Sequence, residues 1–227
     1  LFKRKEAKSM ERTITVKGIG KVSACSDYVI LKMRLEAKDK QYDKVMDTAT
    51  KQLAELKQSL LSIGFEKNAV KTTNFKVYTD YDSYKDEHDH YQRVFTGFVC
   101  CHQLKLAFDF DLKRLSQVLV TIASCPTHLE LDIVFTVKNP TEINDALLRE
   151  AAINAKKKAE LLCEASGVKL GQLLIIDYNW DELNVYSDTK YKFDERSFRE
   201  LSAIPSMDIE PDNIDVQDTA TFVWEIV

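Results

Sequence analysis

The segment EHDH contains the side chains best suited to bind a metal ion. In an extended segment, side chains two residues apart point to the same side, so His88 and His90 would share one side. Asp86 and Asp89 offer carboxylates, and a metal site needs three or four converging ligands. The surrounding stretch, DSYKDEHDHYQ, is polar and typical of a solvated loop tip. We therefore expect a solvated loop with no metal. A metal- or small-ligand site at residues 86–91 is the alternative.

Two glycines, Gly18 and Gly20, follow a strand-like run in ITVKGIGKVSACSDYVIL. A dinucleotide-binding loop needs such glycines to lead into a helix whose N-terminal amides meet the phosphates. Here they lead into a second strand, and the third glycine of the fingerprint is absent. We therefore expect no nucleotide site, and interpret the glycines as a bulge or bend in a long strand.

No familiar catalytic pattern occurs in the sequence. It contains no Ser/His/Asp nucleophile elbow, no phosphate-binding loop and no H-E-x-x-H helix. We expect His102, within a strand-like run, to be a packed or half-exposed side chain rather than a base. The sequence thus predicts no catalytic residue and no cofactor. A hydrolase whose site gathers residues distant in sequence is kept as a second alternative.

Five cysteines are scattered along the chain, at Cys25, Cys100, Cys101, Cys125 and Cys163. Their odd number and the absence of a C-x-x-C pair argue against a disulfide framework or a zinc site. The adjacent pair should point to opposite faces of a strand. We expect buried or half-buried thiols in a reducing compartment, with a redox-sensing thiol as the alternative.

Four tyrosines cluster around the polar loop, at Tyr78, Tyr81, Tyr84 and Tyr91. A purely solvated loop has no need of them. Exposed tyrosines favour interfaces because they bury a rigid ring while keeping a polar tip. We interpret this hairpin as an oligomer or partner contact, with packing on its own sheet as the alternative.

Composition limits the functions available to the 227-residue chain. It is 44% hydrophobic and 30% charged, as in ordinary globular proteins, and its formal net charge is −4. A net negative charge argues against a nucleic-acid surface. No apolar run approaches the roughly 18 residues needed to cross a bilayer, so no membrane insertion is expected.

The first ten residues, LFKRKEAKSM, form a basic N-terminal extension. No apolar stretch follows them, so no signal peptide is visible and a cytoplasmic location is favoured. Because the chain opens on Leu1, a leader removed earlier would allow an exported or periplasmic location instead.

Hydrophobic spacing predicts strands and helices that alternate along the chain. Alternation in YVILKMRLEAK, for example, places every second residue from Val29 to Ala37 in a core. Strands are expected at residues 12–24, 28–38, 70–81, 93–108, 128–138, 172–180 and 214–227. Helices are expected at residues 42–63, 112–125 and 140–166, and residues 181–212 form a polar excursion.

Cap residues support the helix boundaries. Asp111 and Asn139 are suited to the N-cap position, with Pro140 at the first helical position. Gly64 and Gly167 lie where a left-handed C-cap belongs. The third helix carries a stripe of small and apolar residues that should lie close against a sheet: Leu148, Ala151, Ala155, Ala159 and Leu162.

The resulting order is β-β-α-β-β-α-β-α-β-(excursion)-β. Its hairpin-like strand pairs favour an α+β fold of two layers, with mainly antiparallel sheets covered by helices. A doubly wound parallel sheet is the weaker alternative. We expect one domain at residues 11–227, with two intertwined subdomains at 11–110 and 111–227 as a finer division.

The chain resembles the SIMPL-domain family, which includes periplasmic immunogenic and oxidative-stress-defence proteins. The resemblance rests on the opening segment, TTNFKVYTDYDSY, FTGFVCCHQLKL, REAAINAKKKAELLCEASGVKLGQLLII and IEPDNIDVQDTATFVWEIV. Ser26-Asp27 replaces the usual Pro-Asp, and Thr79-Asp80 stands where a proline is common. These departures affect strand entry and the hairpin.

The resemblance implies an α+β fold, a tendency to form higher homo-oligomers and a role related to stress or the cell envelope. The family has no accepted active-site motif, so it assigns no functional residue. We therefore expect a non-enzymatic, self-associating protein that binds itself or a protein partner.

Overall fold

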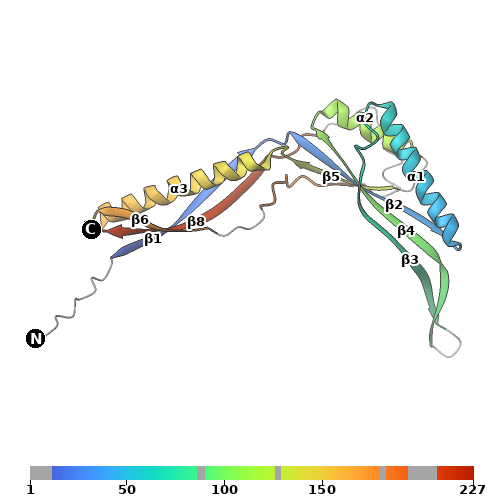
Figure 1. The fold of residues 1–227 in the computed structure, drawn as a ribbon, viewed down its shortest axis with the longest axis horizontal. Coiled ribbons are helices and arrows are strands. Elements are labelled where there is room, and N and C mark those ends of the chain that lie inside the picture. Colours follow the sequence, from blue (N-terminus) through green and yellow to red (C-terminus); the bar gives the residue numbers. More distant parts are fainter. Residues whose placement is uncertain (1–11, 86–89, 126–128, 179–182, 194–208) are drawn as a thin grey trace, which may run out of the picture. The chain divides into compact units, whose positions relative to one another are not determined.

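The structure is a computed structural model that describes residues 12–85, 90–125, 129–178, 183–193 and 209–227. The described chain is an α+β fold with the predicted order of elements and one extra short strand (Figure 1). The elements are β1 (Thr13–Ala24), β2 (Tyr28–Asp39), α1 (Tyr42–Ser62), β3 (Lys71–Lys85), β4 (Tyr91–Asp109), α2 (Leu112–Ala123), β5 (Leu129–Thr136), α3 (Pro140–Ala165), β6 (Leu170–Asp177), β7 (Tyr191–Phe193) and β8 (Ile214–Ile226).

These elements form two compact units, and each has its own antiparallel sheet. The three-stranded unit contains β1, α3, β6 and β8, from the described residues within Leu1–Ala24, Asn139–Val185 and Asn213–Val227. The five-stranded unit contains the remaining elements, within Cys25–Lys138 and Tyr186–Asp212.

The five-stranded unit has the strand order β3-β4-β2-β5-β7. Helices α1 and α2 lie on one face of this sheet (Figure 1). The alternation predicted for β2 is confirmed: Met33, opposite Leu104 on β4 and Leu131 on β5, is only 2% exposed. Apolar side chains thus fill the layer below the helices, and the intervening polar residues point to the other face.

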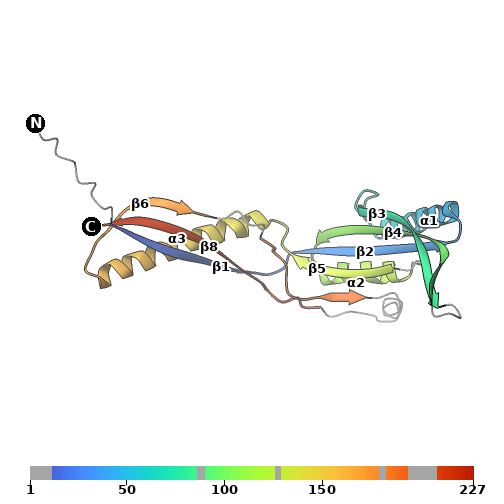
Figure 2. The same cartoon turned by 90° about the horizontal axis from the view of Figure 1, so that it is seen from below.

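In the three-stranded unit the strand order is β1-β8-β6, and α3 runs along the sheet (Figure 2). Of the bulge or bend predicted at the glycines of β1, the bulge is wrong, because β1 pairs with β8 without interruption from Thr13 to Ala24. A Cβ at Gly18 would overlap the carbonyl oxygen of Ala151 on α3. Glycine is required at this position because helix and strand backbones come too close for any side chain.

The small-residue stripe of α3 is confirmed in its middle and wrong at its ends. Ala151, Ala155 and Ala159 are each at most 1% exposed. Leu148 and Leu162 are not among the buried residues, and Leu147 and Cys163 take their places. A stripe must follow 3.6 residues per turn, and the predicted ends lay one residue off the buried line.

Most helix caps agree with the predictions. The Asp111 carboxylate accepts a hydrogen bond from the backbone N–H of Arg114 at 2.7 Å. Gly64 has a positive φ of 90°, as a left-handed C-cap requires. Asn139 occupies the N-cap of α3, but its side-chain amide donates to the Glu142 carboxylate at 2.7 Å instead of accepting from the backbone.

The polar excursion contains a strand that hydrophobic spacing did not predict. β7 pairs with β5 over three residues, which places Lys192 opposite Asp132. Nearby, Tyr186 forms an isolated bridge with Thr136 at the end of β5. A three-residue strand is too short to show a periodic pattern, so only its neighbour reveals it.

Candidate functional site

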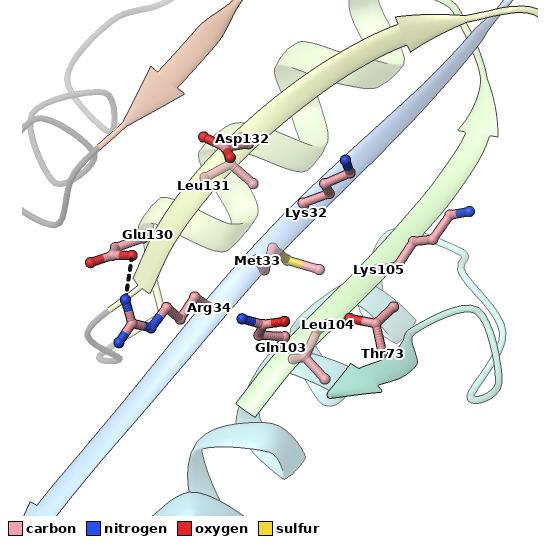
Figure 3. Close-up of a pocket in the computed structure, with 10 residues that line it drawn as sticks. All are labelled: Lys32, Met33, Arg34, Thr73, Gln103, Leu104, Lys105, Glu130, Leu131 and Asp132. Carbon is pink, nitrogen blue, oxygen red and sulfur yellow. Dashed lines mark hydrogen bonds and ion pairs between the residues drawn. The ribbon is translucent and has the colours of Figure 1, made fainter. Parts of the chain in front are cut away.

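The open face of the five-stranded sheet, away from α1 and α2, contains a cavity of about 360 Å³ (Figure 3). Met33, Leu104 and Leu131 also border it, but their side chains belong to the core, so they contribute mainly backbone. The other lining residues come from four strands of the sheet: Lys32 and Arg34 on β2, Thr73 on β3, Gln103 and Lys105 on β4, and Glu130 and Asp132 on β5.

Charged residues cross the sheet in one register beside this cavity. Lys71 on β3 lies opposite Lys105 on β4, and Lys105 lies opposite Lys32 on β2. Lys32 in turn lies opposite Asp132 on β5. We call Lys71, Lys105 and Lys32 the lysine row. Side chains directly opposite on adjacent strands have Cβ atoms about 5 Å apart, so like charges lie side by side in each neighbouring pair, Lys71 with Lys105 and Lys105 with Lys32.

The carboxylates of the cavity have other partners. Asp132 forms an ion pair with Lys192 at 3.9 Å, and Glu130 forms one with Arg34 at 3.4 Å. None of the three lysines of the row forms an ion pair with a described residue. Among the described strand neighbours, Lys71 and Lys105 have only like charges beside them in this row, whereas Lys32 also has Asp132 opposite it.

Arg34 is held in place by three neighbouring groups. Its guanidinium contacts Glu36 at 2.9 Å as well as Glu130, and its Nε donates to the Cys101 sulfur at 3.1 Å. The Cys101 thiol, with smaller contributions from Glu130 and Glu36, raises the pKa of Arg34 further above its ordinary value. The only guanidinium among the described residues of the cavity lining is thus already committed to the protein itself.

The cysteines are mostly buried. The opposite orientations predicted for Cys100 and Cys101 are confirmed, since Cys100 pairs with Ala37 in the core and Cys101 with Glu36 on the open face. Burial raises the pKa of the Cys100 and Cys125 thiols, which keeps both protonated. Cys163 is also buried, and Cys25 is exposed.

His102 is a packed side chain, as predicted. It is 7% exposed, its Nε2 lies 2.8 Å from the Thr72 hydroxyl, and the Phe75 ring contacts it edge-on. Burial lowers the pKa of His102, and the nearby Lys57 charge lowers it further. The imidazole is therefore neutral near pH 7 and makes a structural hydrogen bond.

The metal site predicted at the 86–91 loop lies largely outside the described residues. His88, Asp86 and Asp89 are not described, and His90 stands at the edge of the gap. Elsewhere in the described chain, no three His, Cys, Asp or Glu side chains are placed to hold one metal ion.

The four candidate tyrosines are all exposed, by 38% to 75%, but they do not share a face. Tyr81 pairs with Phe95, their rings 5.8 Å apart, and the Arg93 guanidinium lies 4.8 Å from the Tyr81 ring centre. Alternation along β3 and β4 places Tyr91 on the same side as Tyr81, and Tyr78 and Tyr84 on the opposite side. The hairpin thus offers two aromatic surfaces.

The three-stranded unit presents a different exposed surface. On β6, the aliphatic residues from Leu173 to Ile176 are 46% to 58% exposed. Within the described chain, β6 has β8 on one side and no strand on the other. Such an edge offers unpaired backbone groups to another chain.

Sequence reasoning did not find the lysine row or the β6 surface. Alternation places Lys32 and Lys105 on polar faces, but only the pairing register shows that they meet. The run QLLIID did predict a strand; a strand of four successive aliphatic residues is normally covered on both faces, so its exposure was not expected.

No helix in the described part of the chain is both long and apolar enough to cross a membrane. Comparison with curated proteins found no significant match. The family model SIMPL, described as a protein of unknown function (DUF541), matches residues 14–224. That match covers nearly every strand and helix of both units, and the resemblance noted in the sequence points the same way. The chain belongs to the SIMPL family.

Proposed function

We propose that this protein acts without catalysis, by associating with a second copy of itself through exposed apolar surface. The stress- or envelope-related role that the family resemblance implies is part of the same proposal. The observation that carries the proposal is the run Leu173–Ile176, four consecutive exposed aliphatic residues on an edge strand. Pairing this edge with a second copy would bury part of these side chains, and each Å² of apolar surface removed from water contributes about 25 cal/mol.

The two edges of the three-stranded sheet differ in a way that favours β6. On β1, the Asn154 side chain accepts a hydrogen bond from the Ile19 N–H at 3.1 Å, and Lys158 donates to the Lys17 carbonyl at 3.1 Å. Side chains of α3 thus cover part of the outer edge of β1. No described side chain bonds to the backbone of Leu173–Ile176. The β6 edge is therefore the one suited to accept another strand.

A second copy fits this edge in antiparallel orientation. Two β6 strands related by a two-fold axis can pair with Ile175 of one copy opposite Ile175 of the other, because residues opposite each other in an antiparallel ladder point to the same face. Leu173 then lies opposite Asp177, so no like charges meet. Backbone hydrogen bonds would join the two sheets, and the aliphatic side chains would pack against their symmetry mates.

The test is the solution mass of the full chain, measured by light scattering. Ile175→Lys places two lysines near the proposed two-fold axis, where repulsion and lost burial should reduce the protein to monomers. Ile153→Lys is the matched control, since Ile153 is 49% exposed on α3 in the same unit and away from β6. It should leave the mass unchanged.

Two results would contradict the proposal. One is a wild-type chain that is monomeric at all concentrations measured. The other is an Ile175→Lys protein that keeps the wild-type oligomer while remaining folded by circular dichroism.

A further inference from the structure

The open face of the five-stranded sheet also carries a feature that self-association does not use. We propose that the cavity beside the lysine row binds a small phosphate monoester that also carries hydroxyl groups, such as a sugar phosphate. This site is in the other compact unit from β6, so it goes beyond the function proposed above.

The charge arrangement is the first reason. Lys71, Lys105 and Lys32 occupy adjacent strands in one register, and no described residue forms an ion pair with any of them. Lys105 is also only partly exposed, so water screens its charge incompletely. Like charges placed directly opposite destabilise a sheet. An anion bound among these ammonium groups would remove that repulsion.

The shape of the sheet is the second, independent reason. The pairing of β3 with β4 shifts between Thr72 and Asn74, which leaves Thr73 as an extra residue at a bulge. Bulges redirect side chains, and Thr73 is indeed part of the cavity lining, close to Lys105 (Figure 3). Its hydroxyl adds an uncharged donor to the lining, and the Gln103 amide adds another opposite Arg34.

The kind of anion follows from which cations remain available. Arg34, the fork-shaped group best matched to a planar carboxylate, is engaged by Glu36, Glu130 and Cys101. The lysines that line the cavity are Lys32 and Lys105, whose ammonium groups act as point charges suited to a tetrahedral phosphate, and Lys71 lies next to Lys105 in register but outside the lining. Phosphate is therefore favoured over carboxylate.

The volume and the acidic end of the cavity limit the size and chemistry of the part of the ligand that is not phosphate. At about 360 Å³, the volume is near the lower end of the range for small-molecule sites. Glu130 and Asp132 line the β5 end, where they would accept hydrogen bonds from ligand hydroxyl groups. The same two carboxylates would repel a long polyanion lying across the sheet, so the geometry disfavours nucleic acid.

The experiment titrates the full-length chain with glucose 6-phosphate by calorimetry, with sodium chloride added to hold the ionic strength constant. The wild type should bind saturably, and citrate should bind more weakly. The double variant Lys32→Gln, Lys105→Gln should bind about tenfold more weakly or worse, because it loses charge-assisted hydrogen bonds. Lys76→Gln is the matched control, since Lys76 is on β3 but outside the cavity lining. It should bind like the wild type.

A second measurement does not depend on the ligand. In low salt without any anion, the double variant should melt at a higher temperature than the wild type, because the repulsion within the row is reduced. Added glucose 6-phosphate should raise the melting temperature of the wild type and of Lys76→Gln, but not that of the double variant.

Several outcomes would overturn the proposal. They are no saturable binding by the wild type, equal binding by the double variant, equal loss in Lys76→Gln, and citrate binding as tight as that of the phosphate ester. Binding to a single-stranded oligonucleotide or to phosphatidic acid vesicles, without binding of glucose 6-phosphate, would also overturn it.

Discussion

At the scale of single residues, His102 shows how burial gives a side chain a pH response without a catalytic role. Its ring lies between the Thr72 hydroxyl and the edge of Phe75, and burial lowers its pKa below the ordinary value. In the unfolded chain the same imidazole titrates near about 6.5. The unfolded state therefore takes up a proton at a higher pH than the folded state.

This difference predicts a loss of stability in mild acid. As the pH falls below the unfolded pKa, protonation favours the unfolded state, and the loss continues until the folded pKa is reached. His102→Gln, which keeps a polar side chain beside Thr72 but does not titrate, should show a shallower fall. Urea unfolding of both proteins at pH 7.5 and pH 5.5 measures the effect. Equal losses in the two proteins would show that His102 does not contribute.

At the scale of secondary-structure elements, the contact of α3 with β1 depends on the absence of side chains. Gly18 faces the Ala151 carbonyl of α3, and Gly20 faces that of Leu147. A strand glycine is compatible with a bulge or with a close neighbour, and the choice depends on which helix covers the strand. For that reason the sequence predicted the elements themselves well but misinterpreted these two glycines.

Replacing Gly18 should separate the two elements. Gly18→Ala forces its methyl group against the α3 backbone, and overpacking of this kind costs about 1–3 kcal/mol. Ser23→Ala, at an exposed position of the same strand, should change the free energy of unfolding by no more than about 0.5 kcal/mol. Chemical denaturation of both variants tests this. A Gly18→Ala protein as stable as Ser23→Ala would mean that α3 can move away without cost.

At the scale of the whole molecule, the spacing of apolar residues predicted the α+β class. Each strand and each helix packs one face on a core, and its apolar residues recur with the period of that element. The sites were harder to predict. The lysine row requires the register of three strands, and two of its members, Lys71 and Lys105, are 34 positions apart along the chain. To predict the exposed surface of β6, one must know that no other described strand or helix covers it. Neither property is a periodic feature of the sequence.

The hairpin tyrosines lead to a prediction about the assembly. If the aromatic surfaces of β3 and β4 are a second contact, changing Tyr81 and Tyr84 to serine removes one ring from each face and should lower the solution mass. Ile175→Lys should lower it independently, and the combined protein should be monomeric. Light scattering of the three proteins checks this. An unchanged mass for the tyrosine variant would exclude the hairpin as a contact.

The unequal edges of the three-stranded sheet also determine how far such an assembly can grow. A copy added at β6 presents its own β1 on the far side, where Asn154 and Lys158 already occupy backbone groups. If β6 is the contact between copies, as proposed, pairing through it ends after one addition and does not extend into a fibril. In this way the protein can expose an aliphatic strand with little risk of runaway polymerisation.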